Sequence, residues 1–261
     1  MTYAPFDLSG KVSLVTGGNR GIGYGMAEAL AASNANVAIW GRKADANEKA
    51  VAELEKLGTG DVKAWTVDVA DEAAVVNAMQ ETNAWKGRLD SVIANAGVGF
   101  GASSFHEMDT ETYRKNMSVN MDGAFWTLRE AAKHMVERAR NGDPGGSLVG
   151  VASLAAIEGA AKNQAYGATK GGLISMLKGI ATEYGRHGIR ANAILPGWIA
   201  TDMTAYAQGA EVFETKVISR VPARRWGEPK DFGGVAVYLS SDASSYHSGD
   251  TFVIDGAYAI F

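Results

Sequence analysis

The order of apolar segments along the chain constrains its fold most strongly. Short apolar runs, typical of buried strands, alternate with longer segments whose apolar residues recur every three or four positions, as in amphipathic helices. We predict strands at residues 12–15, 36–40, 62–67, 89–94, 189–195 and 251–254, and one more leading into Ser153. Predicted helices pass through Leu30 and Leu54 and cover residues 71–84, 110–140, 163–185 and 229–239. This alternation predicts a three-layer α/β fold with a doubly wound parallel sheet.

Composition and charge limit the classes of function. The 261 residues are 46% hydrophobic and contain no internal repeat, so we predict a single domain over residues 1–261. The net charge is −4 and the basic residues form no stripe, which argues against nucleic-acid binding. With no cysteine and four scattered histidines, we expect no disulfide and no metal site. No run of about 18 apolar residues suggests a membrane span, and we expect a cytoplasmic protein.

The first turn between a strand and a helix is rich in glycine. Gly17, Gly21 and Gly23 are spaced G-x-x-x-G-x-G, unlike the G-x-G-x-x-G of the standard dinucleotide fingerprint. Glycines permit a tight turn, and the start of the helix presents free N–H groups to a pyrophosphate. A plain connection is the alternative, but three glycines favour phosphate binding. Because no Gly-Lys-Ser/Thr follows, a Walker A loop is not predicted.

The end of the second strand indicates which nicotinamide dinucleotide the chain prefers. In NAD sites an Asp or Glu about twenty residues beyond the glycine turn binds the ribose 2′-hydroxyl, whereas a nearby Arg accommodates the 2′-phosphate of NADP. Gly41 stands there instead, followed by Arg42, and Arg20 lies in the glycine turn. NADP(H) is therefore the predicted cofactor and NAD(H) the alternative. The alternative is that Arg20 and Arg42 are simply solvated surface residues, but this would not explain why the acidic residue is missing.

Tyr166 and Lys170 stand four residues apart in a predicted helix, so their side chains project from one face. A lysine cation lowers the pKa of a nearby tyrosine, which is normally about 10. Tyr166 could then exchange a proton with a carbonyl oxygen that Ser153 also binds. Alternatively, Tyr166 is only a partly buried ring beside a solvated amine. The presence of a cofactor site elsewhere in the chain decides between the catalytic and the structural interpretation. Ser153 lies in V-A-S-L-A, not G-x-S-x-G, so a hydrolase is not predicted.

Other segments carry weaker signals. Asp68, Asn95 and Ser153 follow predicted strands, at the edge where such sheets bind ligands. Residues 198–221 form either a substrate lid or a pair of surface helices. Residues 45–48 have the character of a helix capping box. Asn120, inside a predicted helix, proves nothing alone.

Together these residues resemble the short-chain dehydrogenase/reductase family over essentially the whole chain. The matching elements, which are weak singly but specific in this order and spacing, are Thr16-Gly17 through Gly23, Asn95-Ala96-Gly97, Asn120, Ser153, Tyr166 with Lys170, and Pro196-Gly197 with Thr201. Within the family the chain is similar to 3-oxoacyl reductases and gluconate 5-dehydrogenases.

The resemblance implies a Rossmann-type sheet of about seven strands and hydride transfer between nicotinamide and a carbonyl or alcohol carbon. It implies a catalytic tetrad in which Tyr166 is the acid/base, Ser153 orients the substrate oxygen, Lys170 binds the nicotinamide ribose, and Asn120 holds a relay water. The cofactor residues it implies, together with those argued above, are Gly17, Asn19, Arg20, Gly21, Ile22, Gly23, Arg42, Asp68, Val69, Asn95, Ala96, Gly97, Tyr166, Lys170, Pro196, Gly197, Ile199 and Thr201. It also implies a homotetramer.

The substrate is the least constrained prediction. No basic cluster marks a place for a carboxylate, a phosphate or a carrier protein, and the predicted lid is rich in aromatic and aliphatic residues. We predict an NADP(H)-dependent oxidoreductase acting on a small, neutral, moderately apolar ketone or secondary alcohol. The alternatives are an NAD-dependent alcohol, polyol or steroid dehydrogenase and, more remotely, a non-catalytic dinucleotide sensor.

Overall fold

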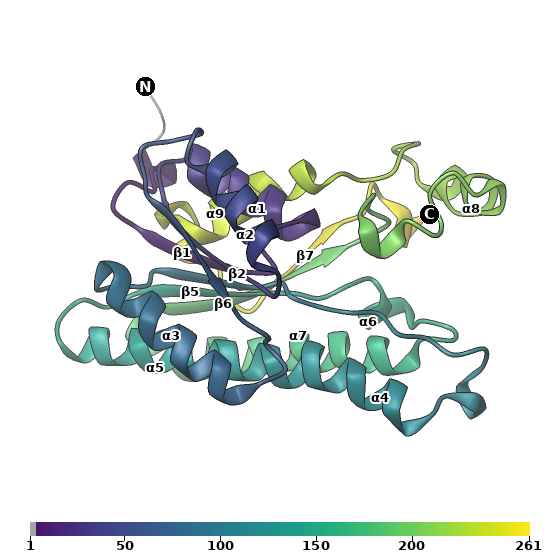
Figure 1. The fold of residues 1–261 in the computed structure, drawn as a ribbon, viewed down its shortest axis with the longest axis horizontal. Helices are drawn as coiled ribbons and strands as arrows, with labels where there is room; N and C mark the ends of the chain where they lie inside the picture. The colour runs from purple at the N-terminus through teal and green to yellow at the C-terminus, as the bar shows by residue number, and fades with distance from the viewer. Residues whose placement is uncertain (1–3) are drawn as a thin grey trace.

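All strands of the computed structural model, which describes residues 4–261, run parallel in one sheet (Figure 1). Their order is β3-β2-β1-β4-β5-β6-β7. The strands are β1 (Val12–Thr16), β2 (Asn36–Gly41), β3 (Val62–Thr66), β4 (Ser91–Ala94), β5 (Gly146–Val151), β6 (Ile189–Pro196) and β7 (Thr251–Ile254). The predicted seven-stranded doubly wound α/β sheet is therefore confirmed.

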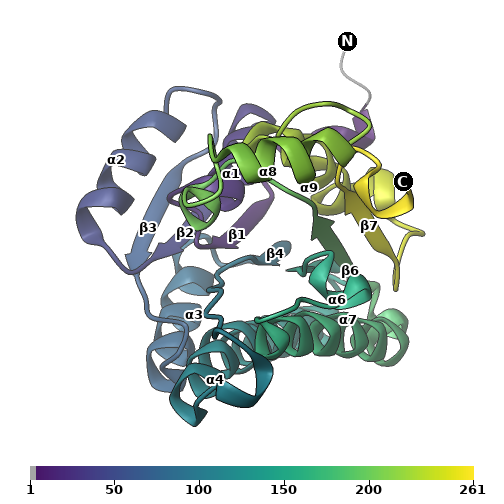
Figure 2. The same ribbon diagram turned by 90° about the vertical axis from the view of Figure 1, so that its right-hand side faces the viewer.

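Helices cover both faces of the sheet, so that the molecule has three layers (Figures 1 and 2). One face carries α1 (Gly21–Ala32), α2 (Ala44–Leu54) and α9 (Gly233–Ser240). The other carries α3 (Glu72–Lys86), α4 (Thr110–Met117), α5 (Gly123–Arg140) and α7 (Gln164–Tyr184). The short helices α6 (Ala155–Glu158) and α8 (Glu211–Lys216) lie beyond the carboxyl ends of the strands.

Alternate residues of each strand face opposite layers, which gives the protein two apolar cores. In β5, Leu148 packs with the core under α3, α5 and α7, whereas Val149 and Val151 pack with the core under α1, α2 and α9. Successive side chains of a strand point to opposite faces, and a sheet covered on both sides needs apolar residues at nearly every position. This explains why the strands appear in the sequence as continuous apolar runs.

The chain order reverses at β1, which pairs with β2 on one side and β4 on the other. Loops that leave the carboxyl ends of β1 and β4 therefore diverge to opposite faces, and a crevice opens between them. The glycine turn, the segment after Asn95 and Ser153 all lie at this edge. The topology thus brings the predicted site residues to one end of the sheet.

Several helix boundaries differ from the prediction. The region 110–140 is not one α-helix, because a π-helical segment, Ser118–Asp122, separates α4 from α5. The capping box at 45–48 is wrong: α2 begins at Ala44 after Lys43, and no side chain caps it. The last predicted helix begins with a 3₁₀ turn, Pro229–Phe232, before α9. Between residues 201 and 221 lie the 3₁₀ turns Asp202–Thr204 and Ile218–Arg220 with α8 between them.

Among residues 4–261, no helix is long and apolar enough to span a bilayer. The same residues contain no group of three or more His, Asp or Glu side chains placed to hold a metal ion.

A buried carboxylate ties together the opposite edge of the sheet, where the strands begin. Asp90 is 8% exposed and accepts a hydrogen bond from the Val12 amide at 2.8 Å. It also pairs with Arg88 at 2.6 Å and Arg138 at 2.9 Å. Burial alone would raise the pKa of Asp90, but these hydrogen bonds and positive charges lower it below the ordinary value of 3.8. The ion pairs therefore stabilise the fold above about pH 4, and that stability is lost as the pH falls through the lowered pKa.

We expect Asp90→Ala to lower the free energy of unfolding at pH 7 by about 3–5 kcal/mol, because Arg138 would lose its buried partner and keep only an exposed one. Urea denaturation measures this loss. The matched control is Asp143→Ala, which removes an Arg138 partner that is 53% exposed and should cost less than about 1 kcal/mol. Equal losses in the two variants would contradict the role given to Asp90.

Candidate active site

Tyr166 and Lys170 lie one turn apart on α7, as predicted. The Lys170 ammonium is 5.6 Å from the centre of the Tyr166 ring and donates a hydrogen bond of 2.8 Å to the Val151 carbonyl. Lys170 is 4% exposed, which is unusual for a lysine. The Val151 carbonyl belongs to the end of β5, so this bond anchors α7 to the carboxyl edge of the sheet.

Ser153 brings a hydroxyl to the same place from the loop after β5. Its Oγ accepts a hydrogen bond from the Ala155 amide at 3.2 Å at the start of α6, and it lies near enough to the Tyr166 phenol to lower the pKa of that group. The predicted convergence of hydroxyl, phenol and ammonium is therefore present. Donors and acceptors in this arrangement can bind one substrate oxygen from two sides.

The pKa shifts at this cluster differ from the prediction. Burial raises the pKa of Tyr166 above 10, and the nearby Ser153 hydroxyl acts in the opposite direction. Burial lowers the pKa of Lys170 to about 8. The expectation that Lys170 lowers the tyrosine pKa is wrong for this arrangement, because the ammonium points to the Val151 carbonyl and the face of the ring. Tyr166 is consequently protonated at neutral pH.

Asn120 lies within the π-helical segment and is buried. Its Oδ1 accepts from the Val98 amide at 2.8 Å, and its Nδ2 donates to the Val98 carbonyl at 2.8 Å. A Cβ on Gly97 would lie 3.3 Å from the Asn120 oxygen and 3.4 Å from the Lys170 nitrogen. Gly97 thus lets Asn120 approach Lys170, and the four predicted catalytic residues are gathered at one place.

A second asparagine repeats this contact one turn earlier, and the sequence did not single it out. Asn116 is fully buried; its side chain accepts from the Phe100 amide at 3.2 Å and donates to the Phe100 carbonyl at 2.8 Å. Asn116 and Asn120 each bind both the backbone N–H and the C=O of one residue, Phe100 and Val98 respectively, with the pairing seen between adjacent strands of a sheet. Two asparagines four apart in one helical stretch were the available signal.

The segment held by these amides forms a wall beside the phenol. A Cβ on Gly99 would lie 3.6 Å from Nδ2 of Asn163 and 3.9 Å from both a ring carbon of Tyr166 and the sulfur of Met203. Met203 belongs to the segment after β6, so parts of the chain about a hundred residues apart meet here. A substrate carbonyl directed at Tyr166 would lie against this wall.

The glycine turn has the shape that a dinucleotide requires. Gly17 and Gly21 have φ values of +64° and +55°, in the left-handed region that favours glycine. A Cβ on Gly23 would lie 2.2 Å from the Gly17 carbonyl. At the start of α1 the Arg20 side chain makes no capping hydrogen bond. The backbone around Asn19 and Ile22 is thus open to a phosphate at a helix N-terminus.

Asn95 and Thr16 hold this turn against the loop that follows β4. Asn95 donates from Nδ2 to the Thr16 carbonyl at 2.9 Å, and the Thr16 hydroxyl accepts from the amides of Asn95 and Ala96, both at 3.0 Å. A Cβ on Gly17 would lie 3.0 Å from the Asn95 nitrogen. Asn95, Ala96 and Gly97 therefore border the crevice where the sequence places the cofactor.

The two predicted phosphate-binding arginines are in different states. Arg42 is exposed at the end of β2. Arg20 instead pairs with Asp202 at 3.0 Å, with both side chains exposed. Asp202 begins the segment after Thr201, so the glycine turn is linked to the predicted lid. Arg20 would have to leave Asp202 to bind a phosphate, a competition that the sequence did not indicate.

The remaining predicted cofactor residues lie around the same crevice. Asp68 is exposed and its carboxylate accepts from the Ala70 amide at 3.0 Å, while Val69 is buried. Pro196 ends β6, and Gly197 donates to the Ile254 carbonyl at 3.0 Å. Ile199 is buried, and the Thr201 methyl would lie 3.5 Å from a Cβ on Gly21. Thr201 therefore faces the glycine turn across the crevice.

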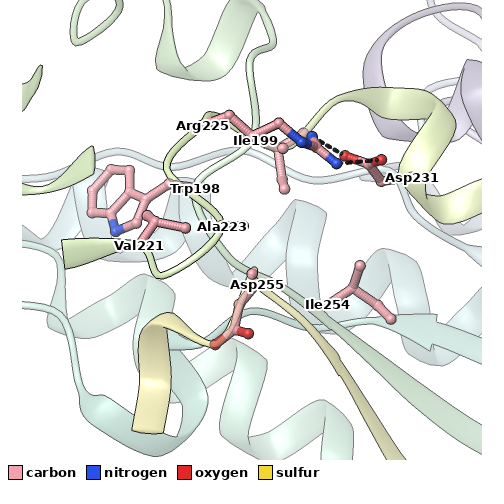
Figure 3. Close-up of a pocket in the computed structure, with 10 residues that line it drawn as sticks. Trp198, Ile199, Val221, Ala223, Arg225, Asp231, Ile254 and Asp255 are labelled. Atoms are coloured by element: carbon pink, nitrogen blue, oxygen red, sulfur yellow. Dashed lines mark hydrogen bonds and ion pairs between the residues drawn. The ribbon is translucent and has the colours of Figure 1, made fainter. Parts of the chain in front are cut away.

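Ile199 also lines a second cavity, of about 270 Å³ (Figure 3). Its lining comes from the segments around Trp198 and Val221–Gly227 and from the end of β7, not from the residues around Tyr166. Its charged groups already have partners. Arg225 makes two hydrogen bonds to Asp231, at 2.7 and 3.0 Å, and Asp255 accepts from two backbone amides. We assign no ligand to it.

Comparisons with known proteins agree with this geometry. The family model described as enoyl-(acyl carrier protein) reductase matches residues 17–259. A gluconate 5-dehydrogenase of Gluconobacter oxydans is 35% identical, with 98% of this chain and 97% of that protein covered. The NADP-dependent (R)-specific alcohol dehydrogenase of Lentilactobacillus kefiri is 34% identical, with coverage of 96% and 97%.

Among solved structures, a candidate NAD(P)-dependent gluconate 5-dehydrogenase of Beutenbergia cavernae, which contains NADP at low occupancy, is 31% identical. It superimposes with a TM-score of 0.91, covering 98% of this chain and 100% of the other. Sequence and fold thus match over nearly the whole chain, with the motif residues gathered at one edge of the sheet. The chain belongs to the short-chain dehydrogenase/reductase family of oxidoreductases.

Proposed function

We propose that this protein is an NADP(H)-dependent oxidoreductase that interconverts a ketone and a secondary alcohol, using Ser153, Tyr166, Lys170 and Asn120. The observation that carries this proposal is the meeting of a protonated phenol and a serine hydroxyl beside a glycine cradle. Relatives named as dehydrogenases of alcohols and gluconate support the reaction class.

The residues present fit a dinucleotide. The cradle of Gly17, Gly21 and Gly23 would hold the pyrophosphate, with the N–H groups at the start of α1, which no side chain caps, directed toward it. Asp68 and Val69 would border the adenine, and Pro196, Gly197, Ile199 and Thr201 would border the nicotinamide. Asn95 to Gly97 would lie along the cofactor between the two ends, and the Lys170 ammonium would bind the nicotinamide ribose.

In the reductive direction, the chemistry that a reduced nicotinamide held at this site would supply is a hydride for the carbonyl carbon, leaving the nicotinamide oxidised. The oxygen, which gains the electron pair of the broken π bond, takes the proton of the Tyr166 hydroxyl. Ser153 donates a hydrogen bond to the same oxygen and orients it. The phenolate left on Tyr166 then regains a proton from water. That Asn120 holds a relay water stays a prediction.

Tyr166 holds its proton at neutral pH, as the proton donor in the reductive direction must. A proton donor must hold its proton before the reaction, and burial keeps Tyr166 protonated. Oxidation of an alcohol needs a phenolate, whose population rises only at high pH. At pH 7 Tyr166 is therefore in the protonation state that reduction of a carbonyl requires.

The NADP preference rests on the end of β2. Gly41 supplies no carboxylate for a ribose hydroxyl, and the exposed Arg42 follows it. The Lentilactobacillus enzyme is NADP-dependent and the Beutenbergia structure contains NADP, which supports the same preference here.

We infer that residues 198–221 form a lid over the substrate. Trp198 packs against Phe213 at 5.4 Å and Trp226 at 6.3 Å between ring centres, which attaches α8 to the rest of the segment. Met203 and Tyr206 are 48% and 73% exposed. Met203 lies beside Gly99, and these exposed side chains suit a neutral, moderately apolar substrate. The gluconate dehydrogenases among the relatives support sugar acids as the competing class.

A substrate screen with both cofactors tests the proposal as a whole. We expect neutral ketones with NADPH to give the highest kcat/KM, and we expect the KM for NADPH to lie well below that for NADH. The screen follows nicotinamide absorbance over neutral ketones, secondary alcohols, polyols and sugar acids. If sugar acids are the best substrates, the apolar substrate class is refuted; if NADH has the lower KM, the cofactor preference is refuted.

We expect Tyr166→Phe to lower kcat/KM by about 10²- to 10⁴-fold, because positioned proton transfer contributes that much. Cofactor affinity, measured by nicotinamide fluorescence, should change little. Tyr184→Phe, the same substitution at the far end of α7, is the control and should retain activity. Unchanged turnover in Tyr166→Phe would remove the catalytic role and favour a dinucleotide sensor.

The lowered pKa of Lys170 predicts that cofactor binding depends on pH. A lysine with a pKa of about 8 carries its full charge at pH 7 and loses most of it by pH 9. Affinity for NADPH should therefore fall by up to about tenfold between these values. Fluorescence titration at each pH measures it. In Lys170→Met binding should be weaker and nearly independent of pH, and an equally steep dependence there would assign the titration to another group.

A further inference from the structure

A pair of asparagine amides fills the space above Gly41, the position at which an acidic residue would bind the ribose of NAD. A Cβ on Gly41 would lie 2.3 Å from Nδ2 of Asn19 and 2.3 Å from Oδ1 of Asn47. Both distances are far below van der Waals contact. Any side chain at position 41 must therefore displace this pair.

Asn47 is the fixed member of the pair. It is 3% exposed on α2, and both its amide nitrogen and its amide oxygen are hydrogen-bonded. Nδ2 donates to the Gly41 carbonyl at 3.1 Å and to the Trp65 carbonyl at 3.2 Å, and Oδ1 accepts from Asn19 at 2.7 Å. One buried side chain thus connects the ends of β2 and β3 to the glycine turn. A buried amide with all these bonds made resists displacement, because moving it would leave polar groups unsatisfied.

Asn19 is the movable member. It is only partly buried, and its bond to Asn47 is the one hydrogen bond that its side chain makes within the described part of the chain. Without the Asn47 oxygen, nothing described here would hold the Asn19 amide above Gly41. Its position over the end of β2 therefore depends on Asn47.

We propose that Asn47 is a positioning residue that determines cofactor specificity. By holding Asn19 across Gly41, it closes the place that a ribose-binding carboxylate would occupy and leaves Arg42 as the first side chain beyond β2. This inference rests on the proposed preference for NADP(H) and gives it a cause. The preference for NADP(H) would then come from the two asparagine amides that fill the space above Gly41, as well as from the absence of an acidic residue there.

A stability cycle tests the occupied space without any cofactor. We expect Gly41→Ala to lower Tm by roughly 5 °C, because the new methyl group meets an amide that cannot move. In an Asn47→Ala background the same substitution should lower Tm by less than half as much. Gly179→Ala on α7, where a Cβ would meet no atom within 4 Å, is the control and should not lower Tm. Equal losses in both backgrounds would overturn the proposal.

A cofactor switch tests the consequence for specificity, with Kd values for NADPH and NADH measured by fluorescence. Gly41→Asp alone should weaken NADPH binding without improving NADH binding over the unsubstituted protein. Gly41→Asp combined with Asn47→Ala should bind NADH about tenfold more tightly than Gly41→Asp alone, the gain expected for a hydrogen bond to a charged group. Tight NADH binding by the single variant, or no gain in the double variant, would overturn the proposal.

The two measurements separate failure of this inference from failure of the proposed function. If the unsubstituted protein prefers NADH, the proposed cofactor preference is wrong, yet the stability cycle still decides whether Asn47 holds Asn19 over Gly41. Should Gly41→Asp not fold by itself, NADH affinity is compared between Asn47→Ala and the double variant. A gain of less than about twofold there counts against the proposal.

Discussion

The hydroxyl of Thr16 links the two loops on which the site depends. It ends β1 and accepts hydrogen bonds from the amides of Asn95 and Ala96, which follow β4. These strands are neighbours in the sheet but lie more than seventy residues apart in the chain, and their loops leave toward opposite faces. Joining the loops at their base fixes the width of the crevice between them. The glycine turn on one side and Gly97, with Asn120 and Lys170 behind it, on the other depend on this link.

Burial has opposite effects on the two ionisable groups of the site. It lowers the pKa of Lys170 and raises that of Tyr166, so each group is pushed toward its neutral form. A neutral phenol is ready to give up a proton, and a lysine that titrates near neutrality responds to whatever negative charge comes close. The proton affinities of the two groups are therefore set by burial and, for Tyr166, also by Ser153.

The sequence predicts the architecture because the sheet is covered on both faces, which turns strands such as β5 into unbroken apolar runs. It also predicts the meeting of Ser153, Tyr166 and Lys170, since helical spacing and parallel topology suffice to bring them together. It does not predict contacts that depend on the packing of distant segments. The pairing of Arg20 with Asp202, the grip of Asn116 on Phe100 and the buried amide of Asn47 are of this kind. The wrong direction of the Tyr166 pKa shift has the same origin, because burial cannot be read from spacing.

The π-helical segment between α4 and α5 has a geometric consequence for the wall of the site. A π turn accommodates about one residue more than an α turn, and each residue of an α-helix rotates the chain by about 100°. The segment therefore shifts the phase of α4 relative to α5 while the two remain nearly collinear (Figure 1). This offset allows α5 to face the sheet core while Asn116 and Asn120 both point at residues 98–100. A regular α-helix of the same length could not both pack α5 against the sheet core and direct Asn116 and Asn120 at residues 98–100.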